Sequence, residues 1–178
     1  MLQTPTTEER VAFKTMRIHH DLTEYLVDKQ RRDAVTSDRL TFSRHAIHMY
    51  GYCGTSALYE YAPGGDLQHL IEDNFDSAAE FVHYYPPTER LLLAFNVTAA
   101  LADVHTTEGT NRYPAIVHGD FKSDQFVAVT EAREDHKLPH FKLGDFNLAR
   151  FVYWNKKHHH PCVIKPDGNG GKNRAPEE

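Results

Sequence analysis

One long apolar segment, TERLLLAFNVTAALADVH at residues 88–105, constrains the fold more than any other part of the chain. Its length suits a helix better than a strand, and as a helix it would carry apolar side chains over much of its surface. Thr88 is well placed to cap the first turn. Such a helix is normally buried, so we expect the rest of the chain to pack around it.

Shorter elements are expected on both sides of this helix. Residues 10–18, 46–53 and 56–62 indicate strands, the last two joined by a tight turn. Charged, amphipathic residues at 21–43 predict a helix, and Asp66 should cap a short helix at 67–72. Three short apolar segments follow residue 115, and a polar tail beginning at Asn155 indicates a loop. This mixture predicts an α/β (α+β) fold.

The composition limits the class of protein. The chain is 40% apolar and 25% charged, as in ordinary globular domains, and its net charge of −5 gives no reason to expect nucleic-acid binding. No apolar run approaches the roughly 20 residues of a membrane span. Only two cysteines occur, far apart in sequence, which favours a reducing compartment such as the cytoplasm. Membrane attachment of a longer parent protein stays open.

One lysine and two aspartates suggest a specific chemistry. Lys14 lies on the first predicted strand, and Asp120 and Asp145 end or follow short apolar segments. Phosphoryl transfer from ATP uses such a set: the lysine neutralises phosphate charge, one carboxylate holds Mg²⁺, and the other accepts the proton of the attacking hydroxyl. Each residue alone is commonplace, and only their occurrence together and in this order indicates that chemistry.

The order of motifs resembles that of the eukaryotic protein kinase domain over nearly the whole chain. VAFK is similar to the lysine strand and LYEYAPGGDL to the hinge. HGDFKSDQ is similar to the catalytic loop, GDFNLAR to the D-F-G segment and RAPEE to the A-P-E motif. The resemblance implies part of a β-rich N-lobe over residues 1–61. It implies the hinge and the first half of a mainly helical C-lobe over residues 62–178, with an activation loop at about 145–177.

The same resemblance implies an ATP site. Lys14 would hold the ATP phosphates, with Asp33 as its ion-pair partner. The backbone groups of Glu60 and Ala62 would contact the adenine. The side chains of Ala12 and Val127 would sandwich its ring.

The implied chemistry lies in the catalytic loop and the D-F-G segment. Asp120 would be the catalytic base, and Lys122 would support the transferred phosphate. Gln125 and Asp145 would bind Mg²⁺. The H-G-D spelling also occurs in small-molecule kinases of the aminoglycoside phosphotransferase kind. Lys122 favours the Ser/Thr protein kinase, because those other enzymes usually have histidine at this position.

Four positions depart from the family pattern. Gln125 replaces asparagine, Asn147 replaces the D-F-G glycine, and Asp33 is one methylene shorter than the usual glutamate. Gly119 replaces the arginine that pairs with an activation-loop phosphate in most regulated kinases. Residues 146–176 also lack serine and threonine, and Tyr153 carries their only hydroxyl. We therefore expect that the protein is not switched by phosphorylation of this loop.

Two family segments are not found in the sequence. No glycine-rich loop precedes Lys14, and no helices follow the A-P-E motif. We expect a partial kinase domain that is inactive as an isolated fragment. ATP-dependent phosphorylation of Ser/Thr in proteins is the first hypothesis. A pseudokinase or interaction scaffold without phosphotransfer is the alternative, and a small-molecule kinase is third. The protein substrate or partner is unknown.

Overall fold

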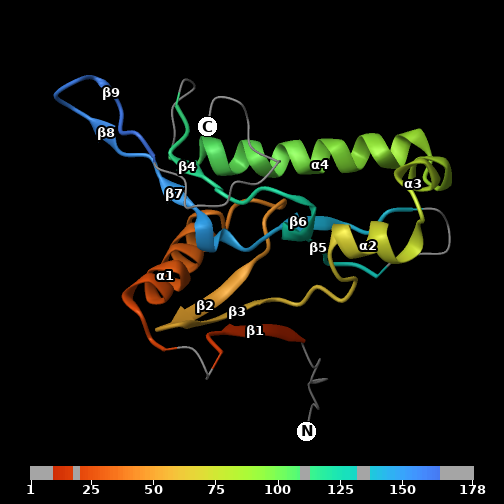
Figure 1. Cartoon of the computed structure of the whole chain (residues 1–178), viewed down its shortest axis with the longest axis horizontal. Helices are drawn as coiled ribbons and strands as arrows, with labels where there is room; N and C mark the ends of the chain where they lie inside the picture. The colour runs from red at the N-terminus through yellow and green to blue at the C-terminus, as the bar shows by residue number, and fades with distance from the viewer. Residues whose placement is uncertain (1–9, 18–20, 109–112, 132–136, 165–178) are drawn as a thin grey trace, which may run out of the picture.

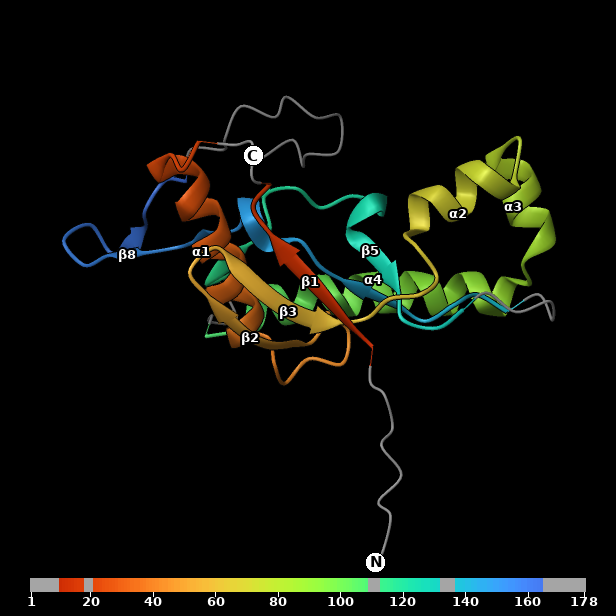
Figure 2. The ribbon, with the colours of Figure 1, turned by 90° about the horizontal axis from the view of Figure 1, so that it is seen from below.

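The computed structural model describes residues 10–17, 21–108, 113–131 and 137–164. Its first part is a three-stranded antiparallel sheet of β1 (Val11–Thr15), β2 (Met49–Cys53) and β3 (Ser56–Glu60), in the order β1-β3-β2. Helix α1 (Glu24–Arg39) packs against this sheet, as Figure 2 shows. The turn between β2 and β3 contains Gly54 at a positive φ of 59°, a conformation that glycine adopts without strain.

The second part is mainly helical. Helices α2 (Leu67–Asn74) and α3 (Ala78–Tyr84) lie at one end of the long helix α4 (Pro87–Thr106), as Figure 1 shows. Short strands pair antiparallel in three sets, which are β4 (Ile116–Val117) with β7 (Arg150–Phe151), β5 (Phe126–Ala128) with β6 (Phe141–Leu143), and β8 (Trp154–Asn155) with β9 (His160–Pro161). Two single 3₁₀ turns, η1 (Ser123–Gln125) and η2 (Phe146–Leu148), lie beside these strands.

Side-chain caps explain where three of the helices begin. Asp66 accepts a hydrogen bond from the His69 backbone N–H, which confirms the predicted cap of α2. Thr23 and Ser77 cap α1 and α3 in the same way. Each cap satisfies a backbone N–H that has no partner inside its helix.

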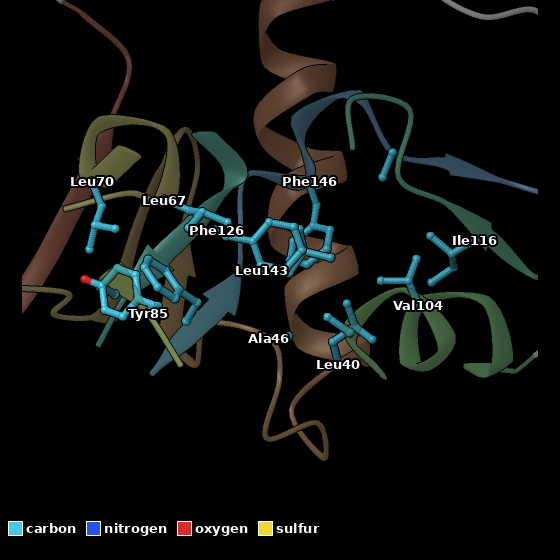
Figure 3. Packing of buried hydrophobic residues seen from close by; sticks show 14 residues of the cluster. Leu40, Ala46, Leu67, Leu70, Tyr85, Val104, Ile116, Phe126, Leu143 and Phe146 are labelled. Carbon is cyan, nitrogen blue, oxygen red and sulfur yellow. The ribbon is translucent and has the colours of Figure 1, made fainter. Parts of the chain in front are cut away.

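Buried apolar residues form two clusters. The larger one joins α4 and the short strands, with Phe126, Leu143 and Phe146 at its centre (Figure 3). The smaller one lies between α1 and the sheet and contains Ala34, Ile47, Met49, Ala57 and Tyr59. The D-F-N turn at residues 145–147 inserts Phe146 into the larger cluster, so the conformation of this turn depends on core packing.

The long helix differs from its prediction at its start and in its burial. Pro86 is the cap residue and Pro87 begins the helix, without a side-chain cap bond, so the predicted Thr88 cap is wrong. Proline suits the first helical position because its missing N–H would have no helical partner there. The expected burial is also wrong for much of the helix, since Leu91 is 70% exposed and Phe95 is 64% exposed. Only Ala100 and Val104 are buried.

Other helix and strand boundaries also differ from the predicted ones. The first strand ends at Thr15 rather than residue 18, and the first helix is shorter than residues 21–43. Helix α3 was not predicted, although its Ser77 cap is a readable signal. The tail predicted as a loop contains the β8–β9 hairpin. The RAPEE motif and the residues before Arg10 lie outside the described residues.

Within the part of the chain that the structure describes, no helix combines the length and apolar character needed to cross a membrane.

Candidate active site

Three charged side chains from distant parts of the sequence meet beside the sheet. The ammonium nitrogen of Lys14, on β1, lies 2.8 Å from Asp33 Oδ2 and 2.6 Å from Asp145 Oδ1. Burial by itself lowers the pKa of Lys14, but the two carboxylates outweigh this effect and the pKa lies above its ordinary value. Lys14 therefore stays protonated and is held as a fixed positive charge.

Asp33 connects α1 to both the sheet and the D-F-N turn. It is 2% exposed, and besides Lys14 its carboxylate accepts the Tyr59 hydroxyl at 2.9 Å and the Phe146 backbone N–H at 2.7 Å. A buried carboxylate without such donors would be costly, so these bonds lock the three elements together. Burial, and then the charge of Asp33, raise the pKa of Tyr59, which therefore stays a hydroxyl donor.

The hydroxyl of Tyr59 is a residue role that sequence reasoning missed. The bond to Asp33 joins residues 26 positions apart in sequence, and no local pattern connects them. Only the packing of α1 on the sheet brings these two side chains together.

The turn that carries Asp145 has an unusual backbone. Asp145 adopts left-handed dihedrals, φ 52° and ψ 66°, which few residues other than glycine tolerate well. Asn147, in the place of the family's glycine, has no positive φ. Its side-chain amide donates instead to Asp145 Oδ1 at 2.8 Å. The tolerance of asparagine for left-handed backbone is therefore not used here, and Asn147 acts by orienting the carboxylate.

The buried His118 connects the turn of Asp120 to Gly144, the residue before Asp145. Its ring is 1% exposed, its Nε2 donates to the Gly144 carbonyl at 3.1 Å, and its Nδ1 accepts the Asp120 backbone N–H at 3.3 Å. Burial lowers the pKa of His118, more than its bond to Gly144 and the nearby carboxylates raise it, so the ring is neutral at pH 7. The Gly144 N–H also donates to the Gln125 carbonyl at 2.9 Å. The turn of Asp120 and the strand leading to Asp145 are thus directly joined.

Glycine at position 119 is required by the local structure. Gly119 has φ 79°, and a Cβ there would lie 2.4 Å from the Leu148 carbonyl oxygen, which is backbone. Any side chain would meet both left-handed strain and a collision that a rotamer change cannot relieve. The arginine of regulated kinases therefore has no room in this turn as it is folded.

We expect Gly119→Ala to lower the free energy of unfolding by at least about 2 kcal/mol, from left-handed strain plus the collision. Gly54→Ala separates the two causes, because Gly54 has φ 59° but open space around its Cβ. It should cost about 1 kcal/mol. Urea unfolding monitored by circular dichroism gives both values. Equal losses for the two variants would show that the Leu148 carbonyl moves aside.

Charged groups around Asp120 form a second cluster. The Lys122 ammonium lies 2.8 Å from Asp124 and 3.6 Å from Asp120, and its bond to Asp124 is the main reason why its pKa is raised. The Gln125 amide nitrogen donates to Asp124 at 2.9 Å and approaches Asp120 at 3.4 Å. Asp124, which sequence reasoning did not single out, therefore positions both neighbours.

The predicted adenine residues gather where β3 leaves the sheet. The Lys142 ammonium pairs with both carboxylate oxygens of Glu60, at 2.7 and 3.0 Å. Further along, the Gly64 N–H donates to the Ala128 carbonyl and the Ala128 N–H to the Gly65 carbonyl. The connection that contains Ala62 is thus fastened at both ends to the β5–β6 pair. The remaining two predicted residues are Ala12 on β1 and Val127 on β5, and both pack against the smaller buried cluster.

Oxygen ligands for a metal ion come from more than one segment. Among the described residues, no group of three or more His, Cys, Asp or Glu side chains has the arrangement of a metal site. Asp145 and Gln125 still offer a carboxylate and an amide oxygen, the ligand types that Mg²⁺ prefers. The contacts described for the Asp145 carboxylate fall on Oδ1. That oxygen faces the Lys14 ammonium and the Asn147 amide.

Comparison with known proteins supports a protein-kinase-like region in this chain. Over 112 residues, which make up 61% of this chain and 29% of the relative, the sequence is 31% identical to Salt tolerance receptor-like cytoplasmic kinase 1 from Oryza sativa subsp. japonica. The chain thus covers less than a third of that relative's length. No protein-family profile matches the chain.

Proposed function

We propose that this chain carries the nucleotide-binding and catalytic segments of a divergent protein kinase that transfers the γ-phosphoryl group of ATP to Ser or Thr in proteins. The observation that carries the proposal is the meeting of Lys14, Asp33 and Asp145 within 2.8 Å. These residues come from three separate parts of the chain, and the buried carboxylate of Asp33 would be costly without such partners. Such a fixed ammonium beside a carboxylate is what the phosphates and cation of ATP need.

The nucleotide would lie between the two clusters of charge. Lys14 would contact the non-transferred phosphates, while the backbone of Glu60 and Ala62 would meet the adenine edge. Ala12 and Val127 would cover the two faces of the ring. When bound, Mg²⁺ would neutralise phosphate charge, and Asp145 with the amide oxygen of Gln125 would hold it.

The hydroxyl of the protein substrate would approach Asp120. The bond between His118 and the Asp120 backbone N–H fixes this turn, so the carboxylate can orient the hydroxyl and accept its proton. Lys122 would support the transferred group by its positive charge. Its ion pair with Asp124 holds the ammonium on the same side of the loop as Asp120.

A scaffold without phosphotransfer is the second candidate, and the position of Gln125 favours it. The amide nitrogen of this side chain donates to Asp124, an arrangement that stabilises the loop without any metal ion. Mg²⁺ requires near-ideal octahedral geometry at about 2.0–2.1 Å, which the longer glutamine arm satisfies less readily than asparagine. In a scaffold, the charged network would serve only to keep the elements together.

Replacement of the catalytic base separates these two functions. In the whole protein, Asp120→Asn should lower phosphate transfer to a Ser/Thr peptide mixture by about 10²–10⁴-fold, since general-base catalysis contributes that much. Binding of Mg²⁺-ATP, measured by calorimetry, should change less than about twofold. The matched control is Asp73→Asn on the exposed side of α2, which should change neither quantity.

Three outcomes decide the matter. A parent protein that binds Mg²⁺-ATP but transfers no phosphate to any Ser/Thr peptide supports the scaffold. A parent that phosphorylates small amines or hydroxyl compounds, and not peptides, supports the small-molecule kinase. Equal turnover by the parent and Asp120→Asn contradicts the assigned base.

A further inference from the structure

The β8–β9 hairpin extends away from the body of the described chain, beyond β7, as Figure 1 shows. Its two strands pair Trp154 with Pro161 and Asn155 with His160, and turn residues 156–159 connect them. None of the residues assigned to nucleotide binding or phosphate transfer belongs to this hairpin. It is therefore a surface outside the candidate active site.

The hairpin and its flanks carry only positive formal charge. Residues 146–164 contain three lysines and arginines and no aspartate or glutamate, although the whole chain has a net charge of −5. Two of these cations, Lys156 and Lys157, lie in the exposed turn, and exposed histidines at 158–160 follow them. Among the residues that the structure describes, no carboxylate pairs with either lysine. The turn thus presents a cationic patch that the chain itself does not neutralise.

The backbone of this turn is held by a side chain. Asn155 Oδ1 accepts hydrogen bonds from the Lys157 and His158 backbone N–H groups, both at 3.1 Å. Asparagine stabilises tight turns in this way. The His158 and His160 rings stack beside the turn with their centroids 5.9 Å apart. The two lysines are therefore presented together, at one end of a defined hairpin.

Large apolar side chains are exposed on the same hairpin. Tyr153 is 71% exposed, Trp154 is 47% exposed, and Val163 is 87% exposed. The Trp154 ring packs against the Tyr113 ring with centroids 5.4 Å apart, which anchors the indole while leaving about half of it open to solvent. Scattered exposed apolar residues are ordinary, but here they accompany unpaired cations on one projecting segment.

We propose that the β8–β9 hairpin binds peripherally to a membrane surface that contains anionic phospholipid. Lysines are attracted to the negative potential of such a surface. Tryptophan and tyrosine favour the boundary between lipid and water, because their rings are largely apolar and each carries one polar group. The imidazole N–H groups of residues 158–160 can donate hydrogen bonds to lipid phosphate oxygens.

The apolar side chains favour a membrane over another anionic partner. An acidic polypeptide or a nucleic acid would neutralise the two lysines, but neither requires an exposed aliphatic side chain such as Val163. A bilayer accepts the cations at its headgroups and the apolar side chains just below them. This inference goes beyond the proposed phosphate transfer and does not depend on it, because it uses neither nucleotide nor metal ion.

The first experiment uses the fluorescence of Trp154, the only tryptophan in the chain, which reports on this hairpin alone. The 178-residue chain is titrated with vesicles of phosphatidylcholine containing about 30% phosphatidylserine, an anionic lipid. The emission should move to shorter wavelength in a saturable manner, because the indole leaves water. Pure phosphatidylcholine vesicles should cause little change. Raising the salt concentration to about 0.5 M should weaken the anionic binding, since salt screens exposed charges.

Paired substitutions test whether the turn carries the binding. Lys156→Gln combined with Lys157→Gln should weaken affinity by about tenfold or more in vesicle sedimentation, because each lysine near an anionic surface contributes about fivefold. Arg10→Gln combined with Arg17→Gln is the matched control. It makes the same charge change at exposed positions on either side of β1 and should alter affinity less than about twofold. Circular dichroism checks that both variants keep the fold.

Four results would overturn the proposal. The first is equal binding to anionic and neutral vesicles, and the second is an equal loss for the lysine variant and its control. The third is sedimentation with vesicles while the Trp154 emission stays unchanged, which would place the contact on another surface. The fourth is a shift of that emission with polyglutamate or a nucleic acid but not with vesicles, which would assign the patch to an acidic macromolecule.

Discussion

Asp33→Ala is expected to lower the free energy of unfolding by about 3–5 kcal/mol, because it removes the one acceptor that three donors share inside the fold. The Tyr59 hydroxyl, the Phe146 N–H and the Lys14 ammonium all donate to this carboxylate. After replacement, two donors stay buried without their partner, and each unsatisfied group costs about 1–3 kcal/mol. Urea unfolding of the 178-residue chain measures the loss.

Two comparisons show whether the network explains the loss. Asp38→Ala on the same helix replaces an exposed carboxylate, and it should cost no more than about 0.5 kcal/mol. Tyr59→Phe removes one donor and leaves the carboxylate with the others, so it should cost about 1 kcal/mol. If Asp33→Ala were no more harmful than Asp38→Ala, the hydrogen bonds of Asp33 would not stabilise the fold.

Asp33→Glu tests whether the shorter side chain is adapted to its site. Glutamate, the usual residue of the family at this position, would add one methylene to the side chain. Asp33 is 2% exposed and both of its carboxylate oxygens already accept hydrogen bonds. Overpacking of this kind typically costs about 1–3 kcal/mol. A gain in stability would instead show that the aspartate is a weakened remnant.

Asp145→Asn is expected to abolish the Mg²⁺-dependent part of ATP binding in the whole protein. The change removes the formal charge that would hold the cation and also weakens the contact with Lys14. Gln125→Asn should act in the opposite direction and tighten Mg²⁺-ATP binding or raise turnover, because the shorter amide places its oxygen with less folding of the side chain. Calorimetry with and without a chelator measures both effects.

The exposed Asp73→Asn variant is again the control and should behave as the parent. A parent that binds ATP equally in chelator and in Mg²⁺, together with an unchanged Asp145→Asn, would defeat the enzyme hypothesis and leave the scaffold. A Gln125→Asn variant that weakens a Mg²⁺-dependent activity would instead show that the geometric account of the glutamine is wrong.

Local features of the chain could be predicted because their causes are local. The two strands joined by a tight turn, the Asp66 cap and the mixed α+β character all follow from residues close in sequence. The order of motifs also indicated Lys14, Asp120 and Asp145 as a set, with Asp33 as the partner of Lys14, and the structure brings Lys14, Asp33 and Asp145 together. Their kinase roles stay predictions, while their proximity is an observation.

Features that depend on packing were not predictable in the same way. The apolar residues of α4 predicted burial, yet burial requires a neighbour, and the described residues cover only part of this helix. The sequence predicted a cap at Thr88, but the folded backbone places the cap two residues earlier, at Pro86.

The tertiary structure alone decided how the charged residues are used. Tyr59 reaches Asp33, Asn147 reaches Asp145, and Gly119 meets the Leu148 carbonyl through contacts between separate segments. Residue types and spacing specify which chemical groups are present and which elements carry them. The directions and partners of those groups follow from long-range packing, which no local pattern in a single sequence encodes.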